Sequence, residues 1–292
     1  MIKKVLNDYN KKIEAAIDLY LPDSFSNYKT VTDAMRYSLL LGGKRIRPVL
    51  LLEFFKVCGG KGDSALPFAA ALEMIHTYSL IHDDLPCMDN DDMRRGKPSN
   101  HKVFGEDIAL LAGDGLLTHA FFVASKTEDI PANLVVSAIG ELSAFAGYNG
   151  MVGGQVIDLE SEGKNVCAEL IEELNLLKTS GLIRAAAKIG TILAGAEERL
   201  VKAADEYGKA LGLAFQIVDD ILDTCGDEAT FGKPTGSDEK NNKSTLVSLW
   251  GVEKCRQKVD ELTETALGCL STFDGDTEFL KELTQYLSKR EN

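Results

Sequence analysis

The sequence lacks the features that would divide it or place it in a membrane. Only seven of its 292 residues are proline, and no Pro-, Ser- or Gly-rich linker interrupts it. At roughly 150 residues per domain this length allows two domains, but nothing marks a boundary, so we predict one domain spanning residues 1–292. No run of 18 or more uncharged apolar residues occurs, and the N-terminal segment has no hydrophobic signal-peptide core. We therefore expect no stable membrane insertion.

Paired cysteines and net positive charge are also missing. The six cysteines are widely spaced and form no CxxC motif, which argues against a disulfide framework or a zinc site and fits a reducing, cytoplasmic location. The net charge is -13, which argues against nucleic-acid binding and against an electrostatic membrane anchor. If the substrates are anions, bound metal ions or clustered Arg and Lys side chains must offset this repulsion.

Helical periodicity is what the sequence does have. Apolar side chains recur at i, i+3, i+4 and i+7 along most of the chain, and no segment alternates in the manner of a strand. We predict one all-α domain of about ten helices, at residues 3–20, 31–41, 47–58, 65–83, 105–124, 132–149, 168–195, 199–223, 244–270 and 276–289.

The strongest local signal is a first aspartate motif between His82 and Arg95. It contains five aspartates within ten residues and ends in two arginines. The motif begins on a predicted helix, on the face that also carries His76 and Ser79. Pro86 disfavours a continued helix, so we expect a bulge before Asp89, and not regular i, i+4 spacing.

A second aspartate motif lies on a predicted helix. Gln216, Asp219, Asp220 and Asp223 fall at i, i+3, i+4 and i+7 and form one stripe. Like charges at this spacing destabilise a helix by roughly 0.2–0.5 kcal/mol per pair unless a cation neutralises them. Carboxylate oxygens are ligands that Mg²⁺ prefers. One such cluster alone is typical of a solvated surface, whereas two on apolar helices indicate metal binding.

Several cations could bind phosphate. The segment GGKRIRP, from Gly42 to Pro48, places three cations on a glycine-opened turn before a helix, where backbone N–H groups and arginine side chains suit an anion. Arg94, Arg95, Lys178, Lys233 and Lys243 are further candidates, although each alone is typical of surface charge. From the residues alone, His76 could be a core histidine or a phosphate contact.

Together these motifs resemble the short-chain trans-prenyl diphosphate synthases, and among them the bacterial farnesyl diphosphate synthases. The resemblance runs from Gly42 to about Leu249 and comprises GGKRIRP, HTYSLIHDDLPCMDNDDMRRGKPSNHK, GGQVIDL, LKTSGLI, FQIVDDILD and GKPTGSDEKNNKST. The pair Leu246-Val247 departs from the family pattern. It follows the last of the implied ligand residues in the sequence, so the departure puts only local packing in doubt.

The resemblance implies an isoprenoid synthase fold around a central cavity, a homodimer, and three Mg²⁺ ions per active site. The implied metal ligands are Asp83, Asp89 and Asp219, with Asp84 and Asp223 as weaker candidates. The implied contacts of the allylic diphosphate are Arg94, Lys178, Thr179, Gln216, Lys233 and Lys243, of which Lys178, Thr179 and Gln216 would act in catalysis. The implied contacts of isopentenyl diphosphate are Gly43, Lys44, Arg47, His76 and Arg95.

The resemblance also predicts the reaction. Isopentenyl diphosphate would condense head-to-tail with dimethylallyl and then geranyl diphosphate to give (2E,6E)-farnesyl diphosphate. Tyr78 and Ser79, five and four residues before Asp83, match the positions that form a floor under the growing product, about 7.5 Å below the aspartate. Tyr78 could instead be an ordinary core residue.

Three other functions compete with this prediction. A geranylgeranyl diphosphate synthase would differ only in product length. A silent partner subunit should have lost one aspartate motif, and both are intact. A metal phosphohydrolase, suggested by His82-Asp83, would need more histidine ligands than the four histidines of this chain supply. Terpene cyclases share the fold but would not be expected to keep the GGKR turn together with the second-substrate residues.

Overall fold

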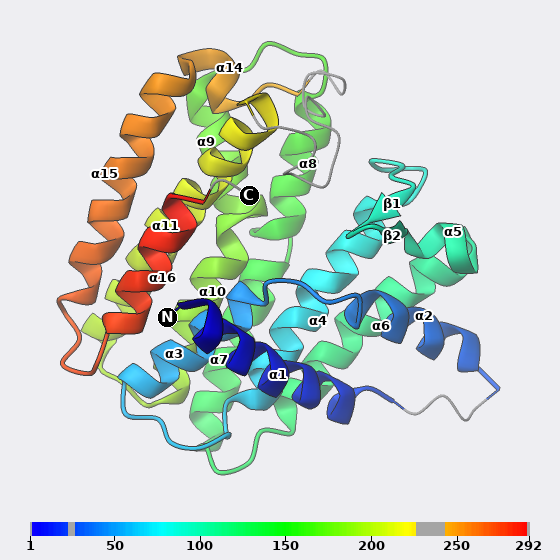
Figure 1. Cartoon of the computed structure of the whole chain (residues 1–292). Coiled ribbons are helices and arrows are strands. Elements are labelled where there is room, and N and C mark those ends of the chain that lie inside the picture. The colour runs from blue at the N-terminus through cyan, green and yellow to red at the C-terminus, as the bar shows by residue number, and fades with distance from the viewer. Residues whose placement is uncertain (1, 23–26, 226–242, 291–292) are drawn as a thin grey trace. The chain divides into compact units, whose positions relative to one another are not determined.

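Helices build almost all of the described structure, as Figure 1 shows for the computed structural model. The structure describes residues 2–22, 27–225 and 243–290. By their contacts the residues fall into two compact units, and each is described by itself. Unit 1 comprises Met1–Leu52 and Lys61–Ile139, and unit 2 comprises Glu53–Gly60 and Gly140–Asn292. The all-α prediction is confirmed, whereas the single domain stays a prediction.

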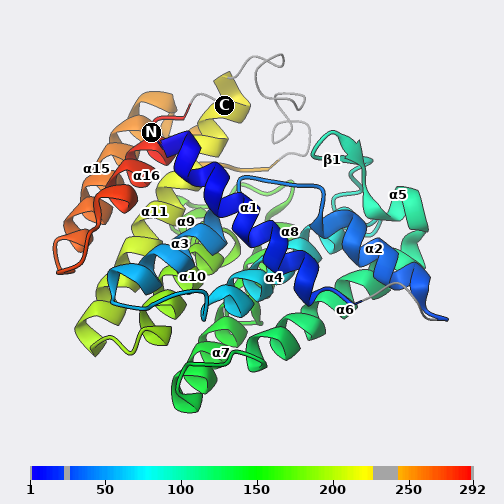
Figure 2. The same cartoon turned by 60° about the horizontal axis from the view of Figure 1, so that its bottom comes forward.

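Unit 1 is built around α4 (Leu66–Asp83), which packs along α6 (Glu106–Ser125) and also contacts α1 (Ile2–Tyr20) and α2 (Lys29–Leu39) (Figure 2). Its other elements are α5 (Asn100–Phe104), the hairpin β1 (Met93–Arg94) and β2 (Lys97–Pro98), and parts of α3 (Ile46–Val57) and α7 (Ala132–Ala146). All residues of α4 from Pro67 to Ile75 are buried. A helix that is apolar on every side in this way belongs to a core, which gives the aspartates at its end a rigid base.

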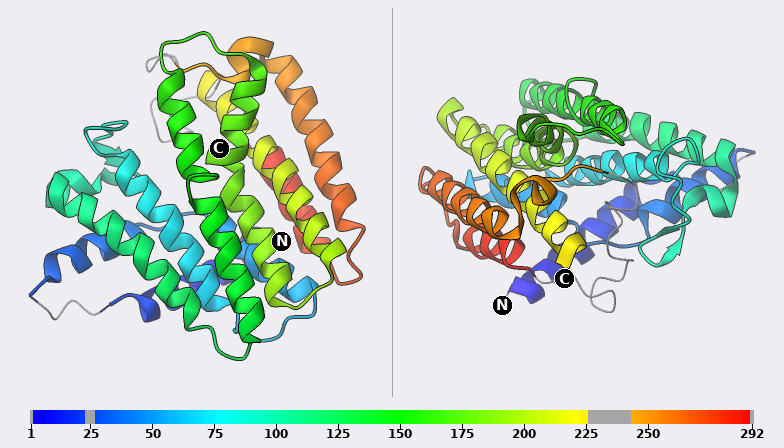
Figure 3. Two further views of the ribbon diagram at one scale, coloured as in Figure 1. Left: turned by 180° about the vertical axis from the view of Figure 1, so that it is seen from behind. Right: turned by 90° about the horizontal axis from the view of Figure 1, so that it is seen from above.

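Unit 2 is built around the long helix α11 (Glu198–Cys225), which packs along α10 (Ser180–Leu193), α15 (Val252–Leu270) and α16 (Glu278–Ser288). Figure 3 shows α11, α15 and α16 side by side. The remaining helices of this unit are α8 (Met151–Ser161), α9 (Ala168–Lys178) and α14 (Leu246–Trp250). Tyr207 is fully buried on α11, where its hydroxyl lies 2.8 Å from the Thr284 hydroxyl of α16 and its ring meets Phe54 edge-on.

Several predicted boundaries were wrong. The helix predicted over residues 168–195 ends at Lys178, and α10 begins at Ser180. The helix predicted over 244–270 is divided by Gly251, whose positive φ of 78° suits a helix terminus. The sequence did not predict α8, nor the five-residue helix α5, nor the two-residue strands, which are too short for a period-two pattern.

Among the described residues, α6 is the one helix whose length and composition would allow it to cross a membrane. Within its most apolar window, 39% of the residues are buried inside the protein. Core helices of soluble proteins satisfy the same test, and buried residues such as Ala112 and Leu116 give α6 a core-facing side.

Candidate active site

The first aspartate motif lies at the end of α4. The helix ends at Asp83, and Asp84 follows as its C-cap. The chain then folds back, and the backbone N–H of Asp89 donates a hydrogen bond of 2.9 Å to the carbonyl oxygen of Asp83. The predicted bulge is therefore present, and it brings Asp83 and Asp89 together.

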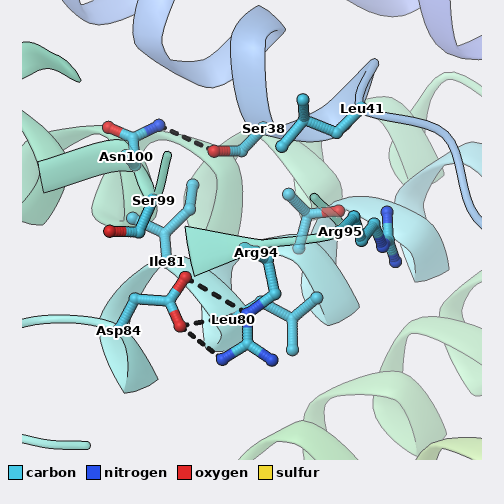
Figure 4. A pocket seen from close by; sticks show the side chains of 10 residues that line it. Ser38, Leu41, Leu80, Ile81, Asp84, Arg94, Arg95, Ser99 and Asn100 are labelled. Carbon is cyan, nitrogen blue, oxygen red and sulfur yellow. Dashed lines mark hydrogen bonds and ion pairs between the residues drawn. The ribbon is translucent and has the colours of Figure 1, made fainter. Parts of the chain in front are cut away.

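The hairpin that follows separates two neighbouring arginines. Arg95 and Gly96 both have positive φ, 52° and 73°, as a two-residue turn between right-twisted strands requires. Arg94 donates from Nε to both carboxylate oxygens of Asp84, at 3.0 and 3.2 Å. The Arg95 guanidinium instead donates to the carbonyl oxygen of Gly42. In Figure 4, Arg94 points towards Asp84 and Arg95 points away from it.

The pair of Asp84 and Arg94 is largely removed from solvent. Asp84 is only 2% exposed. Burial alone would lower the pKa of Arg94, but its hydrogen bond and ion pair with Asp84 outweigh that effect and raise the pKa. Each side chain thus provides a hydrogen-bond and charge partner for the other in this structure. Metal binding by Asp84 and diphosphate binding by Arg94 stay predictions.

The five positions implied to hold isopentenyl diphosphate all belong to unit 1, and we call them the arginine–histidine patch: Gly43, Lys44, Arg47, His76 and Arg95. Nη1 of Arg47 lies 3.5 Å from Nε2 of His76. A Cβ atom at Gly43 would lie 3.0 Å from Cζ of Arg95, so the guanidinium lies directly against this glycine. Lys44 is exposed beside them. The patch gathers donors for an anion.

Charge and burial together keep His76 neutral. Burial, followed by the positive charges of four arginines of which Arg47 acts most strongly, lowers the pKa of His76 well below its ordinary value. A buried ion pair beneath the patch supports it, because Arg45 donates to Glu73 on α4 and to the carbonyl oxygen of Leu39 at 2.7 Å. A neutral imidazole among arginines can donate one hydrogen bond without adding a further charge.

The two residues implied to set product length lie about one helical turn before Asp83 on α4. Tyr78 is 6% exposed, and its ring meets that of His82 edge-on with 5.7 Å between centroids. Burial, and then the charge of Asp83, raises the pKa of Tyr78 to about 12. The hydroxyl of Ser79 donates to the carbonyl oxygen of His76 at 2.9 Å. Tyr78 is thus a buried, uncharged aromatic ring, as a floor requires, and its role stays a prediction.

Unit 2 contains a cavity of about 210 Å³, which we call the lysine cavity. Its polar lining comes from α8, α9, α11 and the segment before α14, and includes Lys178, Thr179, Gln216, Lys243, Asp158 and Asn175. The first four are implied contacts of the allylic diphosphate, and the fold brings them together from distant parts of the sequence. Lys233, a fifth such contact, lies outside the described residues.

A directed chain of hydrogen bonds crosses this cavity. The Thr179 hydroxyl donates to the Gln216 side-chain oxygen at 2.8 Å. The Gln216 amide nitrogen donates to Asp220 at 2.8 Å. Asn175 is 4% exposed, and its amide nitrogen has no hydrogen-bond partner among the described residues. A buried orphan donor is costly, so this nitrogen suits a bound ligand or an ordered water molecule.

The second aspartate motif lies on α11, in the helix that the sequence predicted. Asp219 is the most exposed of its three aspartates, whereas Asp220 and Asp223 are 5% and 9% exposed. Arg290, at the described end of the chain, donates to the Asp219 carboxylate and to the carbonyl oxygen of Phe215. Its guanidinium carbon lies 3.8 Å from the centre of the Phe215 ring.

Magnesium fits these residues by the chemistry of the donors. No group of three or more His, Cys, Asp or Glu side chains is arranged around one point in residues 2–22, 27–225 and 243–290. Mg²⁺ does not require such a cage, because it is usually held by one or two carboxylates together with phosphate oxygens and water. Asp83 and Asp89 in unit 1 and Asp219 in unit 2 provide such carboxylates.

Sequence reasoning missed two residues of these sites. Asp158 lies in the segment GGQVIDL, which carried the resemblance, but no role was assigned to it; its carboxylate accepts from Lys178 and Lys243. Arg290 follows the last helix directly after Lys289, outside the recognised motifs. No local signal reveals its partner, since Asp219 is distant in sequence.

Comparisons with known proteins identify the class. Residues 28–285 match the model of the polyprenyl synthetase family. A geranylgeranyl diphosphate synthase of Cyanophora paradoxa is 46% identical over 264 residues, covering 90% of this chain and 88% of the relative. A farnesyl diphosphate synthase of Geobacillus stearothermophilus is 43% identical over 293 residues, covering 100% and 98%. The solved structure of geranylgeranyl pyrophosphate synthetase from Pyrococcus horikoshii matches with a TM-score of 0.91 at 30% identity, covering 99% and 98%.

This chain therefore belongs to the polyprenyl synthetase family. Within that family it is a prenyltransferase, a short-chain prenyl diphosphate synthase. The names of the relatives refer to products of different length. The comparisons therefore show the class of enzyme but not the length of its product.

Proposed function

We propose that the chain condenses isopentenyl diphosphate with dimethylallyl diphosphate and then with geranyl diphosphate to give farnesyl diphosphate. The observation that carries this proposal is the presence of two separate sets of anion-binding residues. The arginine–histidine patch of unit 1 suits one diphosphate, and the lysine cavity of unit 2 suits another. A reaction that joins two diphosphate esters needs both.

The side chains bind and orient the two substrates. Arg47 and Arg95 would grip the diphosphate of isopentenyl diphosphate, since arginine holds phosphate in a bidentate manner, and neutral His76 would add one hydrogen bond. Lys178 and Lys243 would hold the allylic diphosphate, where Thr179 and Gln216 present oriented dipoles to the reacting carbon.

The chemistry needs stabilisation of a leaving group more than it needs a nucleophilic side chain. The allylic carbon–oxygen bond breaks, the double bond of isopentenyl diphosphate forms the new carbon–carbon bond, and one proton is lost. The departing diphosphate is a suitable acceptor for that proton. Asp83, Asp89 and Asp219, with Asp84 and Asp223 as weaker ligands, would hold Mg²⁺, which would supply positive charge that stabilises the departing diphosphate.

A product assay tests the proposal. Purified protein is incubated with Mg²⁺, isopentenyl diphosphate and either dimethylallyl or geranyl diphosphate, and the dephosphorylated products are separated by chromatography. We expect a dominant C15 alcohol that disappears when EDTA removes the metal. Failure to condense either allylic substrate would contradict the proposal and favour a silent partner subunit.

A C20 product is the second candidate, because a relative that is 46% identical is named a geranylgeranyl diphosphate synthase. That outcome would leave the roles of both anion-binding sets unchanged. It would contradict only the assignment of Tyr78 as the floor.

We further propose that the enzyme is a cytoplasmic homodimer. The dimer is supported by an apolar stripe on α6, where Leu111 and Phe122 are 52% and 55% exposed. These residues are about three helical turns apart and so lie on nearly the same face. A second copy would cover them. The cytoplasmic location is supported by the six cysteines, all of which are unpaired.

A further inference from the structure

Asp158 holds two lysines with a single oxygen atom. Its Oδ2 atom accepts hydrogen bonds from Nζ of Lys178 and from Nζ of Lys243, the latter at 3.3 Å. The three side chains are 12%, 23% and 18% exposed. The two ammonium groups are therefore directed to one place at the wall of the lysine cavity.

The backbone fixes this arrangement. A Cβ atom at Gly154, one turn before Asp158 on α8, would lie 2.8 Å from the Cα atom of Lys178. Only glycine allows α8 to approach the end of α9 this closely. Lys243 is placed from the other side by its neighbours, because Ser244 donates to the carbonyl oxygen of Lys164 at 3.1 Å and Thr245 caps α14.

Asp158 is ionised in this setting. Burial alone would raise its pKa, but the charges and hydrogen bonds of Lys178 and Lys243 outweigh burial and lower the pKa below the ordinary value. One negative charge thus lies between two positive charges, and it reduces the repulsion between the lysines.

We propose that Asp158 is a positioning residue, which orders Lys178 and Lys243 in advance for the allylic diphosphate. This inference rests on the proposed function of the lysine cavity. A lysine has a flexible stem and three donors. Because each ammonium has three N–H donors, a hydrogen bond to Asp158 does not exhaust its capacity to bind phosphate oxygens. The cost of ordering two long side chains is then met during folding rather than during binding.

The proposal makes a prediction of opposite sign to a simple argument from charge. If Asp158 acted only as a negative charge, its removal would strengthen the binding of an anion. If it positions the lysines, its removal weakens binding even though the cavity becomes more positive. We expect Asp158→Asn to weaken binding about tenfold.

The test measures binding by calorimetry, with inorganic diphosphate plus Mg²⁺ as one probe and geranyl S-thiolodiphosphate, a slowly ionising allylic analogue, as the other. Asp158→Asn should weaken both, and Asp158→Glu should restore part of the loss. Asp205→Asn is the matched control, because Asp205 also pairs with a basic residue of unit 2, Arg184, outside the cavity. Unchanged or tighter binding in Asp158→Asn would overturn the proposal.

A double-mutant cycle separates positioning from general damage. In a Lys243→Gln background, Asp158→Asn should cost clearly less than about tenfold, because one of the two lysines that it orders is already gone. Fully additive losses would contradict the proposal. Asp158→Ser serves in the same cycle if the asparagine variant does not fold, as judged by thermal unfolding.

Steady-state kinetics adds a third readout. Asp158→Asn should raise KM for the allylic substrate and leave KM for isopentenyl diphosphate unchanged, since the implied contacts of the latter lie in unit 1. An equal rise in both would contradict the proposal. The two hypotheses can fail separately: a wild-type protein that binds diphosphate but condenses nothing disproves the proposed function, while the binding cycle still decides the role of Asp158.

Discussion

At the scale of single residues, Tyr78 offers a test of product length. It is a buried ring about one helical turn before Asp83 on α4, so Tyr78→Ala removes the bulk that would stop the growing chain. We expect products longer than C15 from this variant, measured by chromatography of the dephosphorylated alcohols. Tyr78→Phe keeps the ring and should keep the C15 product. An unchanged C15 product from Tyr78→Ala would make Tyr78 an ordinary core residue.

His76 gives a second residue-scale prediction, for stability against pH. Because the pKa of His76 is lowered in the folded protein, the unfolded chain takes up a proton at this residue more readily. Its contribution to stability is present above the ordinary pKa of about 6.5 and is lost as the pH falls below that value. Urea unfolding at about pH 7.5 and about pH 5.5 should show a larger loss for wild type than for His76→Gln. Equal losses would show that other groups cause the acid sensitivity.

At the scale of elements, the crossing of α8 and α9 leaves no room for a side chain at Gly154. A methyl group at Gly154 would lie 2.8 Å from both the Cα atom and the Cβ atom of Lys178. We expect Gly154→Ala to destabilise the protein by about 1–3 kcal/mol, the usual cost of overpacking, and to weaken diphosphate binding. Thermal unfolding and calorimetry measure the two effects.

Gly140→Ala is the control for this substitution. Gly140 lies within α7, and no atom lies within 4 Å of the position that an added methyl group would take. Alanine should therefore stabilise the helix by roughly 0.5–1 kcal/mol. If both variants behaved alike, the close approach of α8 to α9 would have no role in the site.

The elements also show what the sequence could predict. Both aspartate motifs were placed correctly at the end of α4 and on α11, because helical spacing and the effect of Pro86 are local properties. The end of α9 at Lys178 was missed, since apolar spacing continues through it and the break lies where α8 crosses.

Local sequence patterns could not predict which side chains pair when the partners are distant in sequence. Nothing near Arg94 indicates that a tight hairpin turns it towards Asp84, and nothing near Arg290 indicates Asp219. Asp158 was missed for the same reason, because its role appears only when α8 and α9 are packed together and Lys243 is in place.

At the scale of the whole molecule, the apolar stripe on α6 predicts the oligomeric state. Light scattering after size-exclusion chromatography should give about twice the chain mass of 31.7 kDa for wild type. Leu111→Glu combined with Phe122→Glu should give the mass of one chain, because burying two carboxylates in an apolar interface is costly.

Leu19→Glu is the control, since Leu19 is 76% exposed on a different helix, α1, and its substitution should leave the mass of the dimer unchanged. A wild-type protein with the mass of one chain would disprove the dimer, and a glutamate variant that stays dimeric would place the interface elsewhere.

The hydrogen bonds from Thr179 through Gln216 to Asp220 all run in one direction. Both donated hydrogens point along this series towards the carboxylate, so the only hydroxyl proton of Thr179 is engaged and its oxygen lone pairs are what remain for the cavity. At Thr179 the wall therefore offers electron pairs, in contrast to the N–H donors that Lys178, Lys243 and Asn175 bring to the same cavity. A short-lived carbocation of the proposed reaction would meet there the lone pairs of a fixed hydroxyl oxygen. The hydrogen bond to Gln216 would thus hold a group that favours the ion in a fixed orientation.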